Sequence, residues 1–425
     1  MRVVIVGAGG FIGRHVAGRL RAAGMEVIAA GRSPERLSRL LPGVETIACD
    51  LLRDDARKWE ARLRGVDALV NCAGILSRGA DYAGVHTRGA IALFDGAYAA
   101  GVRRVVQISS LGADDTAVTR YHLSKRTADE HLAMLGGDGT RMGWAIVRPS
   151  LVLGRGGASM ALFSALAALP IVPRIANGNW QVQPIHVDDL SGVVLRLLEA
   201  GRPLALKVDA VGPEPMTTDA LTTALRQWLG LREAPRVSIP RPLLRLAARL
   251  GIGPATPESL VMLERGNTAS VEPLVAATGA RSLGVEQALA LHPAQTTDLM
   301  AARLWPIAAL LRWLLAVVWL AGGVVSLGFA PAQAIAHWLG KLGLPSALGP
   351  LALWSGSLAD IAIGLGLIAG VRGAALAGIA LMLAYSAILT VIAPELWADP
   401  FGPLVKNLAV LGLSLAVNAL EVRRD

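Results

Sequence analysis

The sequence predicts an α/β domain with a doubly wound parallel sheet and a small second lobe, followed by an all-α bundle of four transmembrane helices. Over the first 300 residues, short apolar runs alternate with segments of helical spacing, which is typical of a parallel sheet covered by helices on both faces. From residue 305 onward the chain is nearly free of charge. With 53% hydrophobic and 17% charged residues overall, the chain is too apolar for an ordinary soluble protein.

The first apolar run ends in a glycine-rich segment, GAGGFIG, after which apolar residues recur at helical spacing. Glycines let the backbone approach a pyrophosphate, and the N–H groups that begin a helix attract the anion. The spacing departs from the usual dinucleotide fingerprint because Ile12 occupies its last glycine position. We expect a dinucleotide phosphate to bind at Gly7, Gly10, Phe11, Ile12 and Gly13.

The second expected strand, residues 26–30, is followed closely by an arginine, Arg32. A dinucleotide fold commonly carries a carboxylate here for the ribose 2′-hydroxyl of NAD, whereas an arginine can pair with the 2′-phosphate of NADP. The sequence therefore favours NADP(H) over NAD(H), with Arg36 as a weaker second contact. The alternative is an arginine that is only solvated.

Four more strands are expected at residues 46–49, 68–70, 102–108 and 144–147. In such sheets the ligand binds at the carboxyl ends of the strands. The residues that we expect to line the cofactor there are Asp50, Leu51, Ala73 and Gly74. The two cysteines, Cys49 and Cys72, have no metal-ligand spacing, so we expect buried thiols and no metal site.

Tyr121 and Lys125 stand four residues apart in a segment of helical character, 119–135, so both side chains can share one face. Only five lysines and four tyrosines occur in the chain, which makes this spacing rare by chance. Ser109 and Ser110 end the preceding strand, so a hydroxyl, a phenol and an ammonium can meet in one cleft. A solvated pair on a helix surface is the alternative.

Together these segments resemble the short-chain dehydrogenase/reductase superfamily, in its extended and atypical branches. The resemblance rests on GAGGFIG at 7–13, NCAG at 71–74, ISS at 108–110 and YHLSK at 121–125. It implies a Rossmann-type fold in which Tyr121 is the general acid/base. It also implies that Lys125 lowers the pKa of this tyrosine and holds the nicotinamide ribose, while Ser110 orients a substrate carbonyl. Where the extended branch often has asparagine, this chain has His86, which could replace it or be structural.

The resemblance covers residues 1–295, with a substrate lobe expected mainly at 151–184 and 212–295. The segment QPIHVDD, residues 183–189, resembles a family marker that is mostly structural: Asp188 or Asp189 should cap the helix from Leu190, and His186 is not expected to be catalytic. This half is most similar to the branch that contains the nucleotide-binding accessory subunit of respiratory complex I, which binds NADPH but is regarded as structural.

Four apolar stretches, near 307–329, 348–371, 373–393 and 403–420, are long enough to cross a hydrocarbon core of roughly 30 Å. Arg312 and Asp360 would be costly in lipid, so we expect them inside the bundle, where they could pair. The segment PELWADPFGPLVKNLAVL, residues 394–411, closely resembles the DoxX-like family of small four-helix membrane proteins. That resemblance implies a membrane domain at 305–425 and, in some relatives, association with quinone-linked oxidation.

The expected location is the cytoplasmic (inner) membrane, as a multi-pass protein with the nucleotide-binding domain and both termini in the cytosol. The apolar run at the N-terminus is too short for a secretory signal, and four spans return the chain to its starting side. The arginines that would then lie inside are Arg303, Arg372, Arg423 and Arg424. A net charge of +9 without a basic run does not indicate nucleic acid.

Two classes of function follow, and Ser110, Tyr121 and Lys125 favour the first. It is a membrane-anchored, NAD(P)H-dependent oxidoreductase that acts on a lipophilic carbonyl compound or quinone. The second is a non-catalytic NADPH-binding module that stabilises or assembles a membrane complex. Sugar-nucleotide epimerase or dehydratase chemistry is a third alternative. The expected partners are a lipophilic small molecule and membrane lipids, with a membrane-complex partner or a second copy of the chain as further candidates.

One segment of the lobe also suggests lipid contact. Arg241, Arg245 and Arg249 recur every fourth residue with leucines between them. Such a basic amphipathic helix can lie among lipid headgroups. Ordinary packing of the leucines on the lobe is the alternative.

Overall fold

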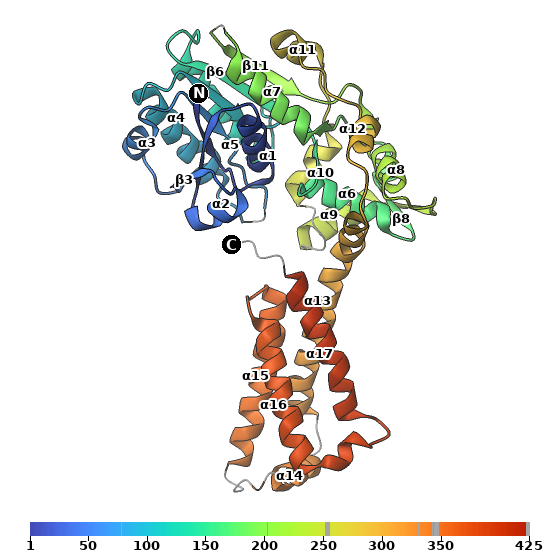
Figure 1. Cartoon of the computed structure of the whole chain (residues 1–425). Helices are drawn as coiled ribbons and strands as arrows, with labels where there is room; N and C mark the ends of the chain where they lie inside the picture. Colours follow the sequence, from blue (N-terminus) through green and yellow to red (C-terminus); the bar gives the residue numbers. More distant parts are fainter. Residues whose placement is uncertain are drawn as a thin grey trace. The chain divides into compact units, whose positions relative to one another are not determined.

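The computed structural model describes residues 1–77, 79–201, 203–250, 256–329, 332–341, 343 and 348–421. The chain divides into two compact units, Met1–Ala302 and Arg303–Asp425 (Figure 1). Each is described below by itself. Arg423 and Arg424, which we expect on the inner side of the membrane, lie outside the described residues.

A seven-stranded parallel sheet forms the centre of the first unit, with the order β11-β6-β5-β4-β1-β2-β3. Its strands are β1 (Arg2–Val6), β2 (Glu26–Gly31), β3 (Glu45–Ala48), β4 (Ala68–Asn71), β5 (Arg104–Ile108), β6 (Gly143–Pro149) and β11 (Ala205–Ala210). The central strands are almost continuously buried because helices cover both faces. The predicted parallel, doubly wound sheet is confirmed, and β11 is a strand that the sequence pattern did not reveal.

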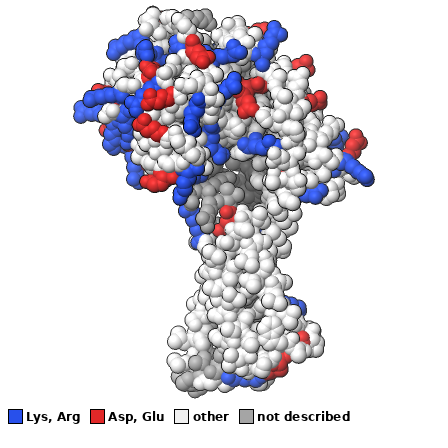
Figure 2. All heavy atoms as spheres, in the orientation of Figure 1, with Lys and Arg blue, Asp and Glu red and all other residues white. Residues whose placement is uncertain are grey.

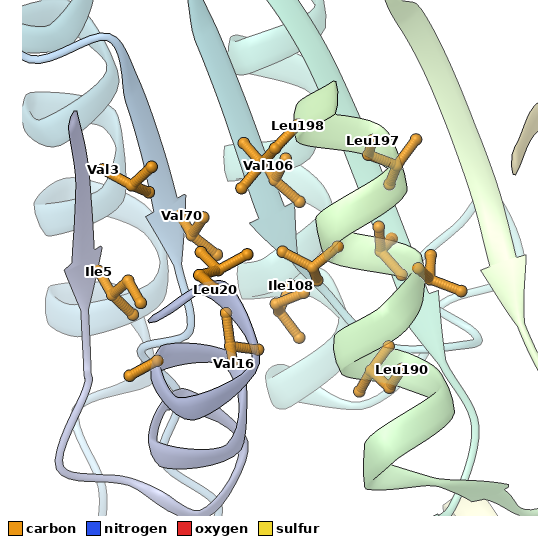
Figure 3. Packing of buried hydrophobic residues seen from close by; sticks show 14 of the residues in the cluster. Val3, Ile5, Val16, Leu20, Val70, Val106, Ile108, Leu190, Leu197 and Leu198 are labelled. Carbon is orange, nitrogen blue, oxygen red and sulfur yellow. The ribbon is translucent and has the colours of Figure 1, made fainter. Parts of the chain in front are cut away.

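Two apolar cores lie on opposite faces of this sheet. Figure 3 shows the first, in which α1 (Phe11–Ala22) and α7 (Val187–Glu199) pack Val16, Leu20 and Leu190 against the strands. The second core contains the fully buried Trp59 and Phe94. It lies beneath α3 (Ala56–Leu63), α4 (Gly89–Ala99) and α5 (Arg120–Gly136), while α2 (Pro34–Leu40) and α11 (Glu272–Thr278) complete the first core.

The smaller lobe is built from short strands and helices that pack around a core of their own. Its strand pairs are β7 (Val152–Leu153) with β10 (Ile185–His186), β8 (Val172–Ile175) with β13 (Arg236–Ile239), and β9 (Gln181–Val182) with β12 (Met216–Thr217). Its helices are α6 (Ala158–Ala168), η2 (Ala176–Gly178), α8 (Thr218–Trp228), α9 (Arg241–Leu250), α10 (Pro257–Glu264) and α12 (Val285–Leu291). Between the two segments that form the lobe, the chain passes back to the main sheet, where α7 packs on one face and β11 is the edge strand next to β6.

The predicted amphipathic helix forms as α9, but its charges are partly used within the lobe. Arg245 lies 2.8 Å and Arg241 3.6 Å from Glu264 of α10. Ala248 is buried against the lobe, whereas Leu243 and Leu246 are more than half exposed. Lobe packing therefore accounts for one side of α9, and contact of the other side with lipid stays a prediction.

The second unit is helical. It contains α14 (Ala332–Lys341), α15 (Gly349–Ala369), α16 (Ala374–Ile392), η3 (Pro394–Trp397) and α17 (Pro403–Leu420), together with most of α13 (Thr296–Gly328), which begins in the first unit. Among the described residues, α13, α15, α16 and α17 are long and apolar enough to cross a membrane, as predicted, although α13 begins earlier than the apolar stretch does.

Large apolar side chains cover the outside of these helices. Leu351, Leu408 and Val391 are 66%, 60% and 80% exposed, which suits contact with lipid rather than water. In Figure 2 the visible surface of the bundle is almost free of charged side chains between its two ends. Lys341, the last residue of α14, pairs at 2.6 Å with Glu395 of η3.

Small residues allow close helix packing inside the bundle. A Cβ at Gly323 of α13 would lie 2.6 Å from the carbonyl oxygen of Ser357, and a Cβ at Gly364 would lie 2.6 Å from Leu320. Glycines at such contacts bring membrane helices together where no hydrophobic effect drives association.

The expected pairing of Arg312 with Asp360 is wrong. The hydroxyl of Tyr385 donates a 3.3 Å hydrogen bond to Asp360 instead. The guanidinium of Arg312 lies beside Gly370, 3.7 Å from the position of an ideal Cβ there. Gly370 follows Asp360 by about 15 Å along the helix. The two charges therefore occupy different levels of the bundle.

Candidate active site

The glycine turn after β1 has the geometry of a phosphate cradle. Gly7 has a φ of +77°, and a Cβ there would lie 2.8 Å from the backbone nitrogen of Ala73. A Cβ at Gly13 would lie only 2.3 Å from the carbonyl oxygen of Gly7. Gly10 precedes α1 and supplies no side-chain cap, so the N–H groups of the first turn, from Phe11 onward, stay available to an anion. The turn fits a pyrophosphate. Gly13 allows the close contact between helix and turn for which the usual fingerprint has a glycine at the position of Ile12.

Arg32 lies in the loop that leaves the carboxyl end of β2. Its side chain is exposed, and it forms no ion pair with any residue that the structure describes. The next residue, Ser33, caps α2 by accepting a 3.3 Å hydrogen bond from the backbone N–H of Arg36. Arg32 and Arg36 thus lie on either side of Ser33, where β2 leads into α2. The guanidinium of Arg32 is free to bind a phosphate.

Asp50 and Leu51 follow β3, and Ala73 and Gly74 follow β4. The carboxylate of Asp50 accepts a 3.0 Å hydrogen bond from its own loop, at the N–H of Leu52. Ala73 is held by a 3.1 Å bond from its N–H to Asn71 and lies against Gly7. The ends of β1 and β4 therefore meet directly. The structure places Asp50 and Leu51 at the same edge of the parallel sheet, beyond β2.

The ammonium of Lys125 joins the ends of two strands. Its Nζ donates 3.0 Å hydrogen bonds to the carbonyl oxygens of Ala73, after β4, and Ile108, at the end of β5. The side chain is almost fully buried, and burial lowers the pKa of Lys125 to about 8 although the charge of Asp129 opposes the shift. Lys125 also lies beside Gly74, and thus next to the residues expected to hold the cofactor.

Tyr121 lies one helical turn before Lys125, with Ser110 as its hydrogen-bond partner. Burial raises the pKa of Tyr121 to about 12, and its hydrogen bond with Ser110 only partly opposes this. The direction is the reverse of that expected from the family resemblance, because burial dominates and the charge of Asp129 adds to it. Lys125 directs its ammonium to two backbone carbonyls. At neutral pH the phenol is therefore protonated, and it can give its proton only to a strongly basic group such as an alkoxide.

His86 contacts this tyrosine from a π-helix, η1 (Ala83–Arg88), with ring centroids 5.3 Å apart. Its Nε2 accepts a 2.9 Å hydrogen bond from the N–H of Ile75, so the proton resides on Nδ1, 3.0 Å from Ser124 Oγ. Burial, with the charge of Lys125, lowers the pKa of His86 to about 3. His86 is thus neutral, is held by two hydrogen bonds and packs against Tyr121. Tyr82 contacts both rings.

Asp129 is a buried carboxylate of this site that sequence reasoning missed. It is completely buried behind Lys125, accepts a hydrogen bond from Ser109 and lies 3.9 Å from Arg148. Burial raises its pKa to about 6, against the opposing effects of Ser109 and Lys125. The available signal was its position four residues after Lys125, on the same face of α5.

Two parts of the chain match known families. Residues 7–159 match an NAD(P)H-binding family, and residues 316–415 match the DoxX-like family. The protein therefore carries an NAD(P)H-binding domain with a Rossmann-type fold and a DoxX-like membrane domain. The match confirms the expected nicotinamide cofactor, as NAD(H) or NADP(H).

Curated relatives are similar to about half of this chain. A ceramide reductase of Caulobacter vibrioides is 29% identical over 44% of this chain and 57% of its own. The mitochondrial NADH dehydrogenase [ubiquinone] 1 alpha subcomplex subunit 9 of Arabidopsis thaliana is 25% identical over 57% of this chain and 61% of its own. A (4-alkanoyl-5-oxo-2,5-dihydrofuran-3-yl)methyl phosphate reductase of Streptomyces griseus is 28% identical over 54% and 74%. The chain thus spans about three fifths of the first two, and the resemblance to the branch of the complex I subunit is confirmed.

Solved structures share the fold. MoeE5 in complex with UDP-glucose and NAD aligns with 71% of this chain and 99% of its own, with a TM-score of 0.55 and 20% identity. The UDP-glucose 4-epimerase of Thermus thermophilus in complex with NAD gives a TM-score of 0.53, with 23% identity over the same shares. At these identities the likeness shows a common fold and no more.

Proposed function

We propose that this protein is a membrane-anchored, NADPH-dependent reductase of a lipophilic carbonyl compound or quinone. The observation that carries the proposal is the arrangement of Ser110, Tyr121 and Lys125 beside the glycine turn. A hydroxyl, a protonated phenol and a buried ammonium lie where a bound nicotinamide would end, at the carboxyl ends of β4 and β5. Two of the relatives carry reductase names, which supports the same reaction class.

In this proposal the glycine turn holds the pyrophosphate, and Arg32 and Arg36 pair with a 2′-phosphate. Lys125 holds the nicotinamide ribose. Asp50, Leu51, Ala73 and Gly74 line the rest of the cofactor. When bound, NADPH supplies a hydride to the carbonyl carbon of the substrate.

The proton for the substrate oxygen comes from Tyr121. Its high pKa keeps the phenol protonated across the physiological range, so it is ready to donate as negative charge develops on that oxygen. Ser110 orients the carbonyl by a hydrogen bond. The resulting phenolate then recovers a proton from water, so each turnover consumes one hydride and one proton.

The membrane domain supports a lipophilic substrate. A compound that partitions into the bilayer is concentrated next to an enzyme anchored there, whereas a water-soluble metabolite would gain nothing from the four apolar helices. We place the first unit and both termini on the cytosolic side of the inner membrane. This orientation also puts Arg303 and Arg372 inside, as basic residues prefer.

Substrate reduction in liposomes tests the proposal. Purified protein is reconstituted, and oxidation of NADPH is followed with decylubiquinone, with a long-chain aldehyde and with UDP-glucose. We expect NADPH consumption with at least one of the two lipophilic compounds, and its loss in Tyr121→Phe.

The other two functions predict different results. Tight NADPH binding without oxidation by either lipophilic compound would point to a structural module of a membrane complex. Conversion of UDP-glucose in a parallel assay with NAD⁺, without net reduction of the nucleotide, would point to epimerase chemistry. Either result would overturn the reductase assignment.

A further inference from the structure

Three of the seven histidines gather around a single carboxylate, Asp188, and none of these four residues belongs to the proposed active site, although the ring of His15 contacts Phe11. His292 Nε2 lies 2.9 Å from Asp188 Oδ2, and His186 Nδ1 lies 3.6 Å from the same oxygen. His15 Nδ1 lies 3.5 Å from the second oxygen, Oδ1. The four residues come from α1, from the start of α7 and from the segment after α12.

The helix cap at this place is not the one that the sequence predicts. Neither Asp188 nor Asp189 is the N-cap: α7 begins at Val187, and its N-cap is His186, whose Nδ1 accepts a 3.3 Å hydrogen bond from the N–H of Asp188. Asp189 instead accepts a 2.9 Å bond from the N–H of Leu283. The carboxylate of Asp188 is thus left for the imidazoles.

The ligand atoms lie close to the spacing that a tetrahedral metal ion requires. With metal–ligand distances of about 2.0–2.1 Å, two ligands of a tetrahedral zinc ion lie roughly 3.3 Å apart. The ligand atoms of His186, Asp188 and His292 all lie within 4.8 Å of one another. One nitrogen of each ring lies near Asp188 Oδ2. The rings of His186 and His292 are stacked with centroids 4.7 Å apart, so one ring must turn about its side-chain bonds before both can bind a single ion.

The state of His186 suits a ligand. Metal ions bind imidazole through an unprotonated ring nitrogen. The Nδ1 of His186 already acts as an acceptor, and the bond that it receives is long at 3.3 Å. A metal ion can replace this weak bond with little rearrangement.

We propose that His186, Asp188 and His292 form a binding site for a divalent transition metal ion of the zinc class, with His15 as a fourth ligand or hydrogen-bonding neighbour. Two imidazoles and one carboxylate are a ligand set that zinc accepts. The proposal does not depend on the reductase assignment, because none of these residues belongs to the candidate active site.

Solvent can reach the site through a neighbouring cavity. The cavity has a volume of about 500 Å³ and is lined by Arg14, His15, Gly18, Arg19, Arg155, Asp188 and Ser191. Arg155 is paired with Asp298 at 2.9 Å. The remaining positive charge favours an anion, such as hydroxide, at the open position of the metal. Such a ligand offsets the repulsion between the metal ion and the arginines.

The position suggests a structural role. His292 comes four residues before α13, the helix that continues into the apolar unit, and Arg155 also bonds the carbonyl oxygen of Pro293 at 2.6 Å. A metal ion would fasten this segment to α1 and α7 within the first unit. Binding should therefore stabilise the fold, because an ion that binds only the folded chain shifts the equilibrium toward it.

Cobalt and zinc binding test the proposal directly. Untagged protein in mild detergent, freed of metal by a chelator, is titrated with Co²⁺ and followed by visible d–d absorption, and Zn²⁺ binding is measured by equilibrium dialysis. We expect one ion per chain, displacement of Co²⁺ by Zn²⁺ and a rise in Tm on adding Zn²⁺.

Three variants locate the site. His292→Ala and His186→Ala should each weaken Zn²⁺ binding at least about tenfold and abolish the rise in Tm. His131→Ala is the matched control, since His131 pairs with Asp95 at 2.7 Å without a second imidazole, and it should bind Zn²⁺ as the wild type does. NADPH binding serves as the folding check, and His292, being partly exposed, is the variant expected to fold even if His186→Ala does not.

Several outcomes would overturn the proposal. They are no d–d absorption and no bound Zn²⁺ at millimolar metal, unchanged affinity in His292→Ala with NADPH binding intact, or an equal loss in His131→Ala.

Discussion

The ammonium of Lys125 lies 3.0 Å from the carbonyl oxygen of Ala73. This hydrogen bond holds the charge of Lys125, one helical turn after Tyr121, at the end of β4. Ala73 also lies against Gly7 of the glycine turn. Helix α5, which carries Lys125, and the glycine turn therefore contact the same residue. Changes at either partner should therefore affect cofactor binding.

The first prediction concerns the pH dependence of NADPH binding. Burial lowers the pKa of Lys125 from 10.5 to about 8, so its ammonium is present below pH 8 and is lost as the pH rises through this value. At pH 9 about a tenth of the molecules keep the charge. The Kd for NADPH, measured by nucleotide fluorescence, should rise above pH 8.

Two variants isolate this effect. Lys125→Met should bind weakly already at pH 7 and show no further loss up to pH 9. Lys207→Met removes an exposed lysine of β11 and should behave as the wild type. A Kd that is flat to pH 9.5 in the wild type would contradict the role of Lys125.

The second prediction concerns the glycine turn. Gly13→Ala places a Cβ 2.3 Å from the carbonyl oxygen of Gly7, so the backbone must shift at a cost of about 1–3 kcal/mol. NADPH affinity should fall about tenfold or more by isothermal titration. Gly18→Ala is the control on the same helix, where a Cβ meets nothing within 4 Å. Equal affinities in the two variants would rule out the turn as the phosphate site.

The third prediction concerns proton donation. Tyr121→Phe removes the hydroxyl that we propose as general acid, so kcat for the reducible substrate should fall about 10²–10⁴-fold. The Kd for NADPH should stay unchanged, because the ring still fills its place. Tyr98→Phe, distant on α4, serves as control. A Tyr121→Phe enzyme with near-normal kcat would exclude the phenol from the reaction.

The fourth prediction concerns cofactor choice. Removing the exposed guanidinium in Arg32→Ala should weaken NADPH by about 1.5–3 kcal/mol, the usual value for a hydrogen bond to a charged group. NADH affinity should be unaffected, since it lacks the 2′-phosphate. Arg39→Ala changes another exposed arginine, in the last turn of α2, and should alter neither nucleotide. If the wild type binds NADH and NADPH equally, the assignment to NADP fails.

The fifth prediction concerns topology. Four spanning helices return the chain to its starting side, so a reporter that is active only outside the cytosol should be silent when fused after Asp425. The same reporter inserted after Trp397, between α16 and α17, should be active. Activity of the C-terminal fusion would contradict four spans with cytosolic ends.

Local patterns in the sequence were enough to predict the features that depend on neighbouring residues. The first strand and its glycine turn follow from an apolar run that ends at Gly7. The approach of Tyr121 to Lys125 follows from the period of the α-helix. The four apolar helices follow from composition alone, because hydropathy is summed along a continuous segment and needs no partner.

Contacts between distant residues were decided by the tertiary structure. The partner of Asp360 is Tyr385 rather than Arg312, because the height of each residue in the bundle depends on helix packing. The pKa of Tyr121 rises because packing buries the phenol.

The sequence by itself therefore determined the fold class, the glycine turn and the membrane helices, all of which arise from periodicity and composition within single segments. Only the tertiary structure decided the pairing of β11 with β6 and the meeting of His186 with His292. These residues are brought together by the packing of whole elements, because β11 adds to the edge of the sheet at β6 and α12 lies against β10, and no spacing in the sequence encodes such contacts.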